Sequence, residues 1–143
     1  MSTVEQPDKP STSSRKTKWV VIGLLLLLIA VVVLNLPRGY SDDLTRIGKG
    51  KAAVVLVRDK VAVQSFDLIN VLDALRDKYP GRVEFLLTDF DTPEGRAFIS
   101  ANKAARATLV LFDANGKMVK ILYAPQTVEN LQQEIAGLLG TAS

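Results

Sequence analysis

Two stretches decide the fold: AAVVLV at residues 52–57 and INVLDALRDKYPGRVEFLLTDFD at residues 69–91. The first is a short, continuous apolar run, as in a strand that is covered on both faces of a sheet. The second begins with apolar residues at helical spacing and, after Tyr79-Pro80-Gly81, continues with RVEFLLT at residues 82–88, which is predicted to be a second buried strand. A strand, a helix and a strand in this order predict two parallel strands joined by a helical crossover.

Helices are predicted both before and after the first strand in the sequence. The crossover helix is expected to pack on the sheet through one apolar stripe. The stripe consists of Phe66, Ile69, Leu72 and Leu75, widened by Leu68 and Val71. Before the strand, Ser41 is expected to cap a short helix that Gly48 and Gly50 would end.

A further helix is predicted after the second strand. Asp91 or Thr92 would cap it, because both side chains can accept a hydrogen bond from a free backbone N–H of the first turn. Pro93 suits the first helical position, and the helix would carry residues 97–99 and end near Lys103.

The rest of the chain predicts a hairpin and a last helix. ATLVLF at residues 107–112 and KMVKILY at residues 117–123 are expected to pair as antiparallel strands, with Asn115-Gly116 supplying positive φ at the turn. The last helix would run from a Thr127 cap to Gly140. Helices then cover both faces of a mixed four-stranded sheet, which gives a three-layer α/β domain.

Several stretches resemble the thioredoxin-like superfamily in sequence as well as in element order. VVLV at residues 54–57, followed by the stretch 69–91, is similar to the first strand, long helix and second strand of that family. Thr92-Pro93-Glu94 is similar to the start of its next helix, and ATLVLFDANGKMV at residues 107–119 is similar to its third strand and hairpin. The resemblance covers residues 41–139 and implies a thioredoxin-like fold.

Two departures from the family's pattern bear on function. Active thioredoxins carry Cys-x-x-Cys at the start of the long helix, where the helix dipole lowers the pKa of the first thiol. Ala62-Val63-Gln64-Ser65 takes that place here and holds no thiol. The family's cis-proline is replaced by Ala107, where a cis bond would cost about 2.5–4 kcal/mol, so a trans bond is expected. The resemblance therefore implies the fold without the redox activity.

The side-chain inventory excludes whole classes of chemistry. The chain has no Cys and no His, so it can form no disulfide and no thiolate, and it lacks the commonest metal ligand and the commonest general base. The net charge of +3 is spread over interleaved acidic and basic residues, which gives no sign of a nucleic-acid partner. We expect no enzyme activity, no cofactor and no bound metal.

The run WVVIGLLLLLIAVVVLNL at residues 19–36 is uncharged and long enough for a transmembrane helix. Trp19 and Tyr40 would lie at the two membrane–water interfaces. The alternative is a cleavable signal sequence, but its apolar region is usually about 7–15 residues long, and the exit VLNLPRGYSD holds no small-x-small cleavage site. We expect an uncleaved anchor, whose residues include Trp19, Leu24, Leu25, Leu26, Leu27, Leu28, Val31, Val32 and Val33.

The flanks of this run predict its orientation. Arg15, Lys16 and Lys18 precede it, which favours an N-terminus in the cytoplasm and a C-terminal domain on the periplasmic or outer side of the inner membrane. The predicted division is a disordered cytoplasmic tail at 1–18, a transmembrane signal-anchor helix at 19–36, a linker with a short helix at 37–50 and the thioredoxin-like domain at 51–143.

The start of the long helix is the candidate interaction surface. The candidate residues are Arg58, Asp59, Lys60, Val61, Ala62, Val63, Phe66 and Ala107. The charged residues 58–60 form either a solvated connection or a docking surface. The apolar residues either make an exposed patch for a protein or membrane contact, or Val61 and Val63 are buried by the N-terminal helix.

Asp89 and Asp91 form a carboxylate pair at the end of the second strand, where α/β proteins often bind ligands. A metal or an acid–base site is conceivable there, but a turn with a helix cap explains the same residue types and is favoured.

The sequence as a whole predicts a non-catalytic, membrane-tethered, thioredoxin-like interaction module. Its expected partners are the bilayer and a larger membrane protein complex, of which it would be an accessory or assembly subunit. The alternative is a periplasmic, chaperone-like holder of client polypeptides that uses the apolar end of the domain.

Overall fold

The computed structural model describes residues 13–35 and 39–140 of the chain. The chain divides into two compact units, one before Tyr40 and one from Tyr40 onward. The first unit holds a single helix, and the second holds all the strands and the remaining helices of the described residues.

The first unit contains the helix α1, Ser13–Asn35. The span Arg15–Leu34 of this helix has a mean hydropathy of 2.7. Within the described residues, α1 is the one helix that is long and apolar enough to cross a membrane. A signal sequence near an N-terminus meets the same criteria. All the predicted anchor residues lie on α1 with exposed side chains. Residues 13–18, expected to be part of a disordered tail, are instead helical, because Arg15, Lys16 and Lys18 extend a helix at little cost. The rest of the predicted tail, residues 1–12, lies outside the described residues, as does Leu36.

The second unit is an α/β domain on one four-stranded sheet with the strand order β2-β1-β3-β4. In chain order its elements are η1 (Leu44–Arg46), β1 (Ala52–Arg58), α2 (Val63–Arg76), β2 (Val83–Asp89), α3 (Pro93–Asn102), β3 (Thr108–Phe112), β4 (Met118–Tyr123) and α4 (Val128–Gly140). β1 and β2 are parallel, whereas β3 is antiparallel to both β1 and β4. The predicted mixed sheet, its helical crossover and its hairpin are confirmed.

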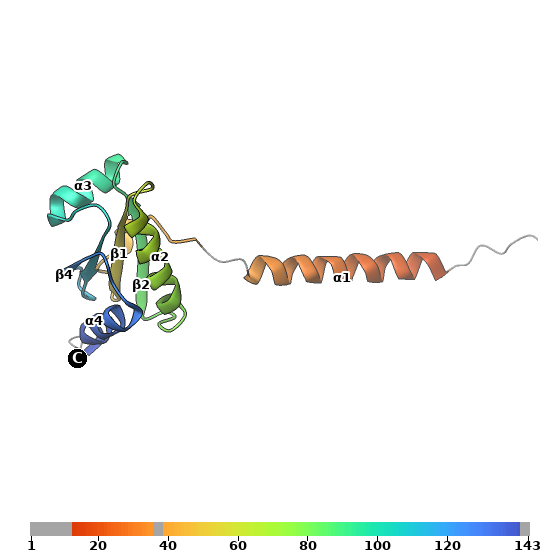
Figure 1. The fold of residues 1–143 in the computed structure, drawn as a ribbon. Coiled ribbons are helices and arrows are strands. Elements are labelled where there is room, and N and C mark those ends of the chain that lie inside the picture. The colour runs from red at the N-terminus through yellow and green to blue at the C-terminus, as the bar shows by residue number, and fades with distance from the viewer. Residues whose placement is uncertain (1–12, 36–38, 141–143) are drawn as a thin grey trace, which may run out of the picture. The chain divides into compact units, whose positions relative to one another are not determined.

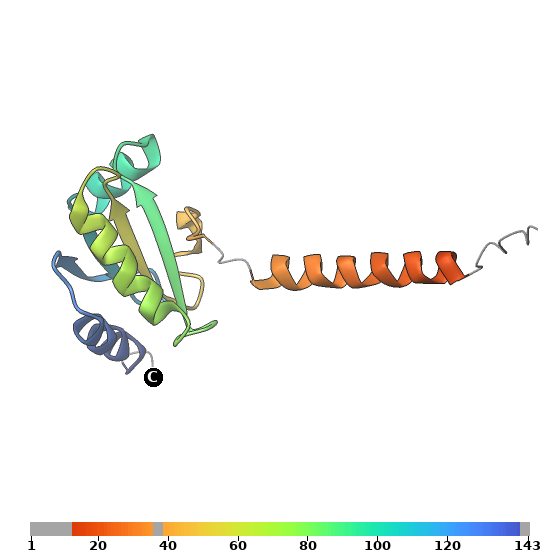
Figure 2. The ribbon, with the colours of Figure 1, turned by 45° about the vertical axis from the view of Figure 1, so that its right-hand side comes forward.

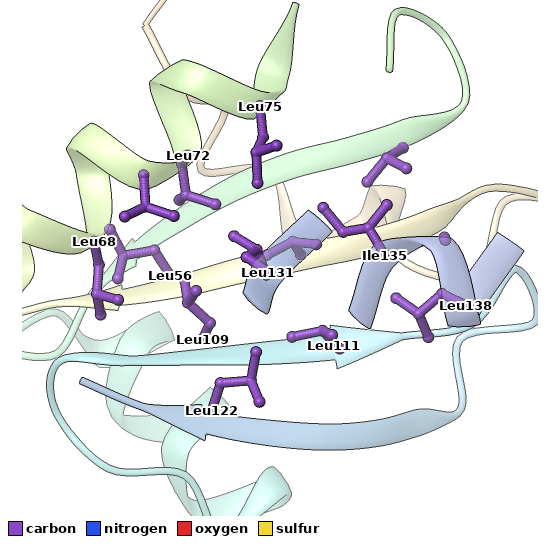
Figure 3. Packing of buried hydrophobic residues seen from close by; sticks show 14 of the residues in the cluster. Leu56, Leu68, Leu72, Leu75, Leu109, Leu111, Leu122, Leu131, Ile135 and Leu138 are labelled. Carbon is purple, nitrogen blue, oxygen red and sulfur yellow. The ribbon is translucent and has the colours of Figure 1, made fainter. Parts of the chain in front are cut away.

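Helices cover both faces of this sheet and make three layers (Figures 1 and 2). α2 and α4 lie on one face, while Phe98 of α3 belongs to the core cluster on the other face and contacts the Phe112 ring of β3, with 5.9 Å between the ring centres. Figure 3 shows how the larger core is filled by side chains of α2 (Leu68, Leu72, Leu75), α4 (Leu131, Ile135, Leu138) and the strands (Leu56, Leu109, Leu111, Leu122). Because β1 is covered on both faces, its residues are apolar without alternation.

The apolar stripe of α2 differs from the prediction at its start, and Ile69 is only partly buried. The buried residues are Ser65, Leu68, Val71, Leu72 and Leu75, whereas Phe66 is 54% exposed. Ser65 takes the first place of the stripe because its hydroxyl is satisfied by a hydrogen bond inside the domain. The aromatic ring next to it is thereby turned outward.

The segment before β1 also differs from the prediction. Ser41 does not cap a helix; its carbonyl accepts a hydrogen bond from the Leu87 N–H at 3.0 Å, and Ser41 bridges the outer border of β2 at Leu86. The helix that follows is the single 3-10 turn η1, whose cap is Asp43. The helical turn begins at Leu44, so Asp43 is the residue that directly precedes it, and the Ser41 hydroxyl accepts a hydrogen bond from the Asp43 N–H instead.

Tyr40 is bound to α2. Its hydroxyl donates a hydrogen bond to Asp73 Oδ1 at 2.6 Å, and the guanidinium of Arg76 lies 4.9 Å from the centre of its ring. Burial and this carboxylate raise the pKa of the Tyr40 hydroxyl above its usual range. Tyr40 therefore fixes the beginning of the domain on the outside of α2.

The turns around α3 and the hairpin follow the predicted chemistry with one exception. Thr92, and not Asp91, caps α3, since its Oγ1 accepts a hydrogen bond from the Gly95 N–H at 3.1 Å. In the hairpin only Gly116 has positive φ, at 83°, whereas Asn115 does not. The turn is stabilised instead by the Asp113 carboxylate, which accepts hydrogen bonds from the backbone N–H groups of Asn115 and Lys117.

Candidate interaction surface

The parallel strands β1 and β2 have their C-terminal ends at the same end of the sheet, where the connections to α2 and α3 begin (Figure 2). β3 starts at this end of the sheet, because Thr108 pairs with Val57. The predicted residues 58–66 and Ala107 are brought together by this topology. The topology alone thus explains why segments nearly fifty residues apart form one end of the domain.

A buried aspartate and a buried serine hold the loop between β1 and α2. Asp59 is 5% exposed, and its Oδ1 accepts a hydrogen bond from the Val61 N–H at 3.1 Å. The Asp59 N–H donates to Ser65 Oγ at 2.9 Å, so the loop is tied to the first turn of α2. Of the two end positions of the family's dithiol motif, Ala62 is the N-cap of α2 without a side-chain hydrogen bond, and Ser65 lies buried beneath it.

Ion pairs join the ends of β1 and β2. The Arg58 guanidinium donates two hydrogen bonds to the Asp89 carboxylate, at 2.6 and 3.0 Å, and Lys60 Nζ lies 3.1 Å from Asp89 Oδ2. These contacts, foremost the hydrogen bond from Arg58, hold the pKa of the Asp89 carboxyl below its ordinary value. Lys60 also lies 3.7 Å from Asp91. The Asp89 and Asp91 carboxylates are thus used in ion pairs, and neither is the cap of α3.

The connection before β3 completes this end of the domain. Arg106 Nη1 lies 3.5 Å from Asp59 Oδ2, and its guanidinium stands 5.0 Å from the centre of the Phe90 ring. Ala107 has a left-handed backbone with φ at 53°, and its N–H donates to the Val57 carbonyl at 2.9 Å. Its peptide bond is trans, as expected, because the one cis bond among the described residues is Ala124–Pro125.

Val61, Val63 and Phe66 form an exposed patch at this end, which we call the apolar patch. They are 88%, 70% and 54% exposed, and Val63 and Phe66 are neighbours on one face of α2 because they are three residues apart. Within the domain, the helical turn before β1 does not bury Val61 or Val63, because both side chains are open to solvent.

The charged candidates divide differently from the apolar ones. Asp59 is buried and Arg58 is partly buried in its pair with Asp89, so both of them hold the loop in place. The Lys60 side chain is exposed while it bridges Asp89 and Asp91. All three charges of residues 58–60 thus take part in ion pairs inside the domain, and docking by these residues stays a prediction.

Sequence reasoning missed Phe90, Arg96 and Arg106 at this end. They line an open hollow of about 500 Å³ between the turn after β2, the helix α3 and the connection to β3. The only signal in the sequence was that Arg106 and Phe90 directly adjoin strand ends, which does not say that they meet. Their proximity depends on pairing between distant strands.

Comparisons with known proteins bear on the fold alone. No protein-family model matches the chain, and no curated protein matches its sequence. Among solved structures, the chain is similar to an uncharacterised thioredoxin-like protein from Clostridium perfringens, with a TM-score of 0.62 and 11% identity over 69% of this chain and 79% of that one. It is also similar to Trxlp from Edwardsiella tarda EIB202, with a TM-score of 0.55 and 16% identity over 64% of this chain and 87% of that one. The second unit, from Tyr40 onward, therefore has a thioredoxin-like fold.

Proposed function

We propose that this chain is a non-catalytic, membrane-tethered interaction module that serves a larger membrane protein complex as an accessory or assembly subunit. The observation that carries the proposal is the apolar patch of Val61, Val63 and Phe66 at the start of α2. Exposed apolar side chains gathered on one surface are typical of a protein contact. They stand at the end of the domain where active thioredoxins hold their dithiol.

The absence of chemistry at that end supports a binding role. The chain has neither Cys nor His, so no thiolate or imidazole can act at the N-terminus of α2. Ala62 offers no nucleophile. The Ser65 hydroxyl is buried and bonded to the Asp59 N–H, and no imidazole is present to activate it.

The apolar helix α1 supports the membrane tether. We propose that α1 stays uncleaved as a signal-anchor in the inner membrane, with the N-terminus in the cytoplasm and the thioredoxin-like domain on the other side. Arg15, Lys16 and Lys18 before the apolar run favour this orientation. A tether raises the local concentration of the domain near membrane partners without any further contact.

Co-purification of the full-length chain in a mild detergent tests the proposal. Proteins retained by the wild type are compared by quantitative mass spectrometry with those retained by Val63→Asp. A carboxylate on the patch should lower retention of the true partner at least about fivefold, because burying an unpaired charge in an interface costs more than about 1 kcal/mol.

Val119→Asp is the matched control, because Val119 of β4 is also exposed, at 55%, but lies outside the patch. The control should retain the partner like the wild type. A chain that is recovered alone in repeated preparations contradicts the proposal, and so does equal loss in both variants.

The alternative function is a holder of extended client polypeptides. The same apolar patch supports it, because apolar surface binds many clients with little selectivity. A holder would retain a mixed, substoichiometric set of polypeptides, whereas a subunit would retain the same partner in fixed ratio. Binding of unfolded peptides to an array, reduced by Val63→Asp and not by Val119→Asp, would favour the holder.

A further inference from the structure

The hollow beside α3 is a separate feature from the apolar patch. It is lined by apolar Phe90, Ile99 and Ala105 and by charged Asp91, Arg96 and Arg106, and its volume is about 500 Å³. Ligand pockets in proteins are commonly about 300–1,000 Å³ in volume, mostly apolar, with a few polar groups that fix orientation. The hollow is open to solvent, has a volume within this range, and combines apolar walls with three charged side chains and Ser100.

Of the charged side chains that line the hollow, one basic residue has no ion-pair partner within the described residues. Arg106 is paired with Asp59 at 3.5 Å and held over the Phe90 ring, and Asp91 lies 3.7 Å from Lys60. Arg96 lies on α3, and within the described part of the chain no ion pair engages its guanidinium. The hollow thus has apolar walls and one guanidinium without an anion.

We propose that this hollow binds an apolar group that carries a single carboxylate. The planar guanidinium of Arg96 can donate two parallel hydrogen bonds to a carboxylate, while Phe90, Ile99 and Ala105 cover the apolar part. A doubly charged phosphate fits less well, because Asp91 lines the same hollow and would repel the second charge. Apolar carboxylates come from two sources, the C-terminal residue of a polypeptide and a free small acid.

Matched probes test the carboxylate. The full chain in lipid nanodiscs is titrated with N-acetyl-leucine and with N-acetyl-leucinamide, and binding is followed by saturation-transfer NMR, with empty nanodiscs as the blank. We expect dissociation constants on the order of 1–10 mM for the acid, given the few heavy atoms of the probe. The amide should bind about tenfold more weakly, because it lacks the charged acceptor. Equal binding of acid and amide overturns the proposal.

Variants of one residue test the role of Arg96. Arg96→Gln should remove the preference for the acid, and Arg96→Lys should restore part of it, because lysine keeps the charge without the planar pair of donors. Arg82→Gln is the control, since Arg82 is exposed and lies outside the hollow. An acid preference that survives Arg96→Gln overturns the proposal.

A third probe, 4-methylpentanoate, distinguishes the sources, because it has the leucine side chain and the carboxylate without the peptide group. Tighter binding of N-acetyl-leucine assigns the site to a polypeptide end, and tighter binding of 4-methylpentanoate assigns it to a free acid. Both results support the proposal. None of these variants alters the apolar patch, so failure here leaves the co-purification result standing.

Discussion

Buried polar side chains hold the loop at the candidate surface in one conformation. The Asp59 N–H donates a hydrogen bond to Ser65 Oγ, and Asp59 Oδ1 accepts one from the Val61 N–H. The other carboxylate oxygen of Asp59 forms an ion pair with Arg106. The rigid loop presents Val61 and Val63 outward in spite of their apolar nature. Exposure of these two residues is thus enforced by the polar residues next to them.

The ion pair between Arg58 and Asp89 predicts a pH dependence. The pKa of Asp89 is lowered in the folded domain, so its stabilisation is fully present above the ordinary carboxyl pKa of 3.8 and is lost as the pH falls through the lowered value. Asp89→Asn should lower the free energy of unfolding by about 1–3 kcal/mol at pH 7, because charged hydrogen bonds are lost. This difference should shrink at pH 3. Urea titrations of the detergent-solubilised chain, followed by circular dichroism, measure both values.

Asp91→Asn is the control for this prediction. Its carboxylate is exposed and 3.7 Å from Lys60, so its removal should change the free energy of unfolding by less than about 0.5 kcal/mol. An Asp89→Asn effect of equal size at pH 7 and pH 3 would show that the ion pair does not titrate as described.

Single residues mark the limit of what the sequence could predict. Helical spacing placed Phe66 in the buried stripe of α2, but the stripe is completed by Ser65, which no apolar pattern can include. Whether a serine is buried depends on a partner for its hydroxyl, here the N–H of Asp59. The hollow was missed for the same reason, since the neighbours that bring Arg96 and Arg106 into one site are distant in sequence.

At the scale of elements, α3 is placed by the close approach of two backbones. A Cβ added to Gly95 would lie 1.8 Å from the Asp89 carbonyl oxygen, so the first turn of α3 touches the end of β2 directly. The same carbonyl accepts a hydrogen bond from Thr92 Oγ1 at 2.8 Å. Gly95 therefore keeps α3, and with it the wall of the hollow, against the sheet.

Gly95→Ala should lower the free energy of unfolding by about 1–3 kcal/mol, because the added methyl group forces the backbone of α3 away from β2. The measurement is the urea midpoint of the full chain in detergent. Gly137→Ala in α4 is the matched control, because nothing lies within 4 Å of a Cβ there. In that open helical position alanine should raise the free energy of unfolding by about 0.5–1 kcal/mol. Equal effects of the two substitutions would contradict the close packing at Gly95.

The elements themselves were predictable because local chemistry specifies them. Runs rich in apolar residues indicated β1, β2 and β3, Thr92-Pro93 indicated the start of α3, and Thr127 indicated the start of α4. The prediction failed at Ser41 because the helical turn begins only at Leu44, which makes Asp43 its cap. The pairing of Ser41 with Leu86 of β2 joins residues that are distant in sequence, so the local sequence could not show it.

At the scale of the whole molecule, the anchor and its orientation can be tested together. The chain has no cysteine, so Gln133→Cys, on an exposed position of α4, introduces the only thiol. A membrane-impermeant maleimide applied to intact cells should label this thiol once the outer barrier is permeable. The labelled protein should remain in the membrane fraction with the mass of the uncleaved chain, 15.6 kDa, plus the label.

Two results would contradict the proposed topology. A labelled product that is shorter by the N-terminal segment would make α1 a cleaved signal sequence. Labelling only after the inner membrane is broken would place the domain in the cytoplasm. Gln64→Cys, at the exposed start of α2, serves as a second reporter in case the label at residue 133 is hindered.

The bridge between Ser41 and Leu86 has a consequence for self-association. It places a bridge and a backbone hydrogen bond in the middle of the outer edge of β2, so another strand cannot pair along that whole edge. β4 is the opposite edge strand, and no such bridge is found on its outer side within the described residues. We therefore expect contacts between copies through the sheet to form along β4 rather than along β2.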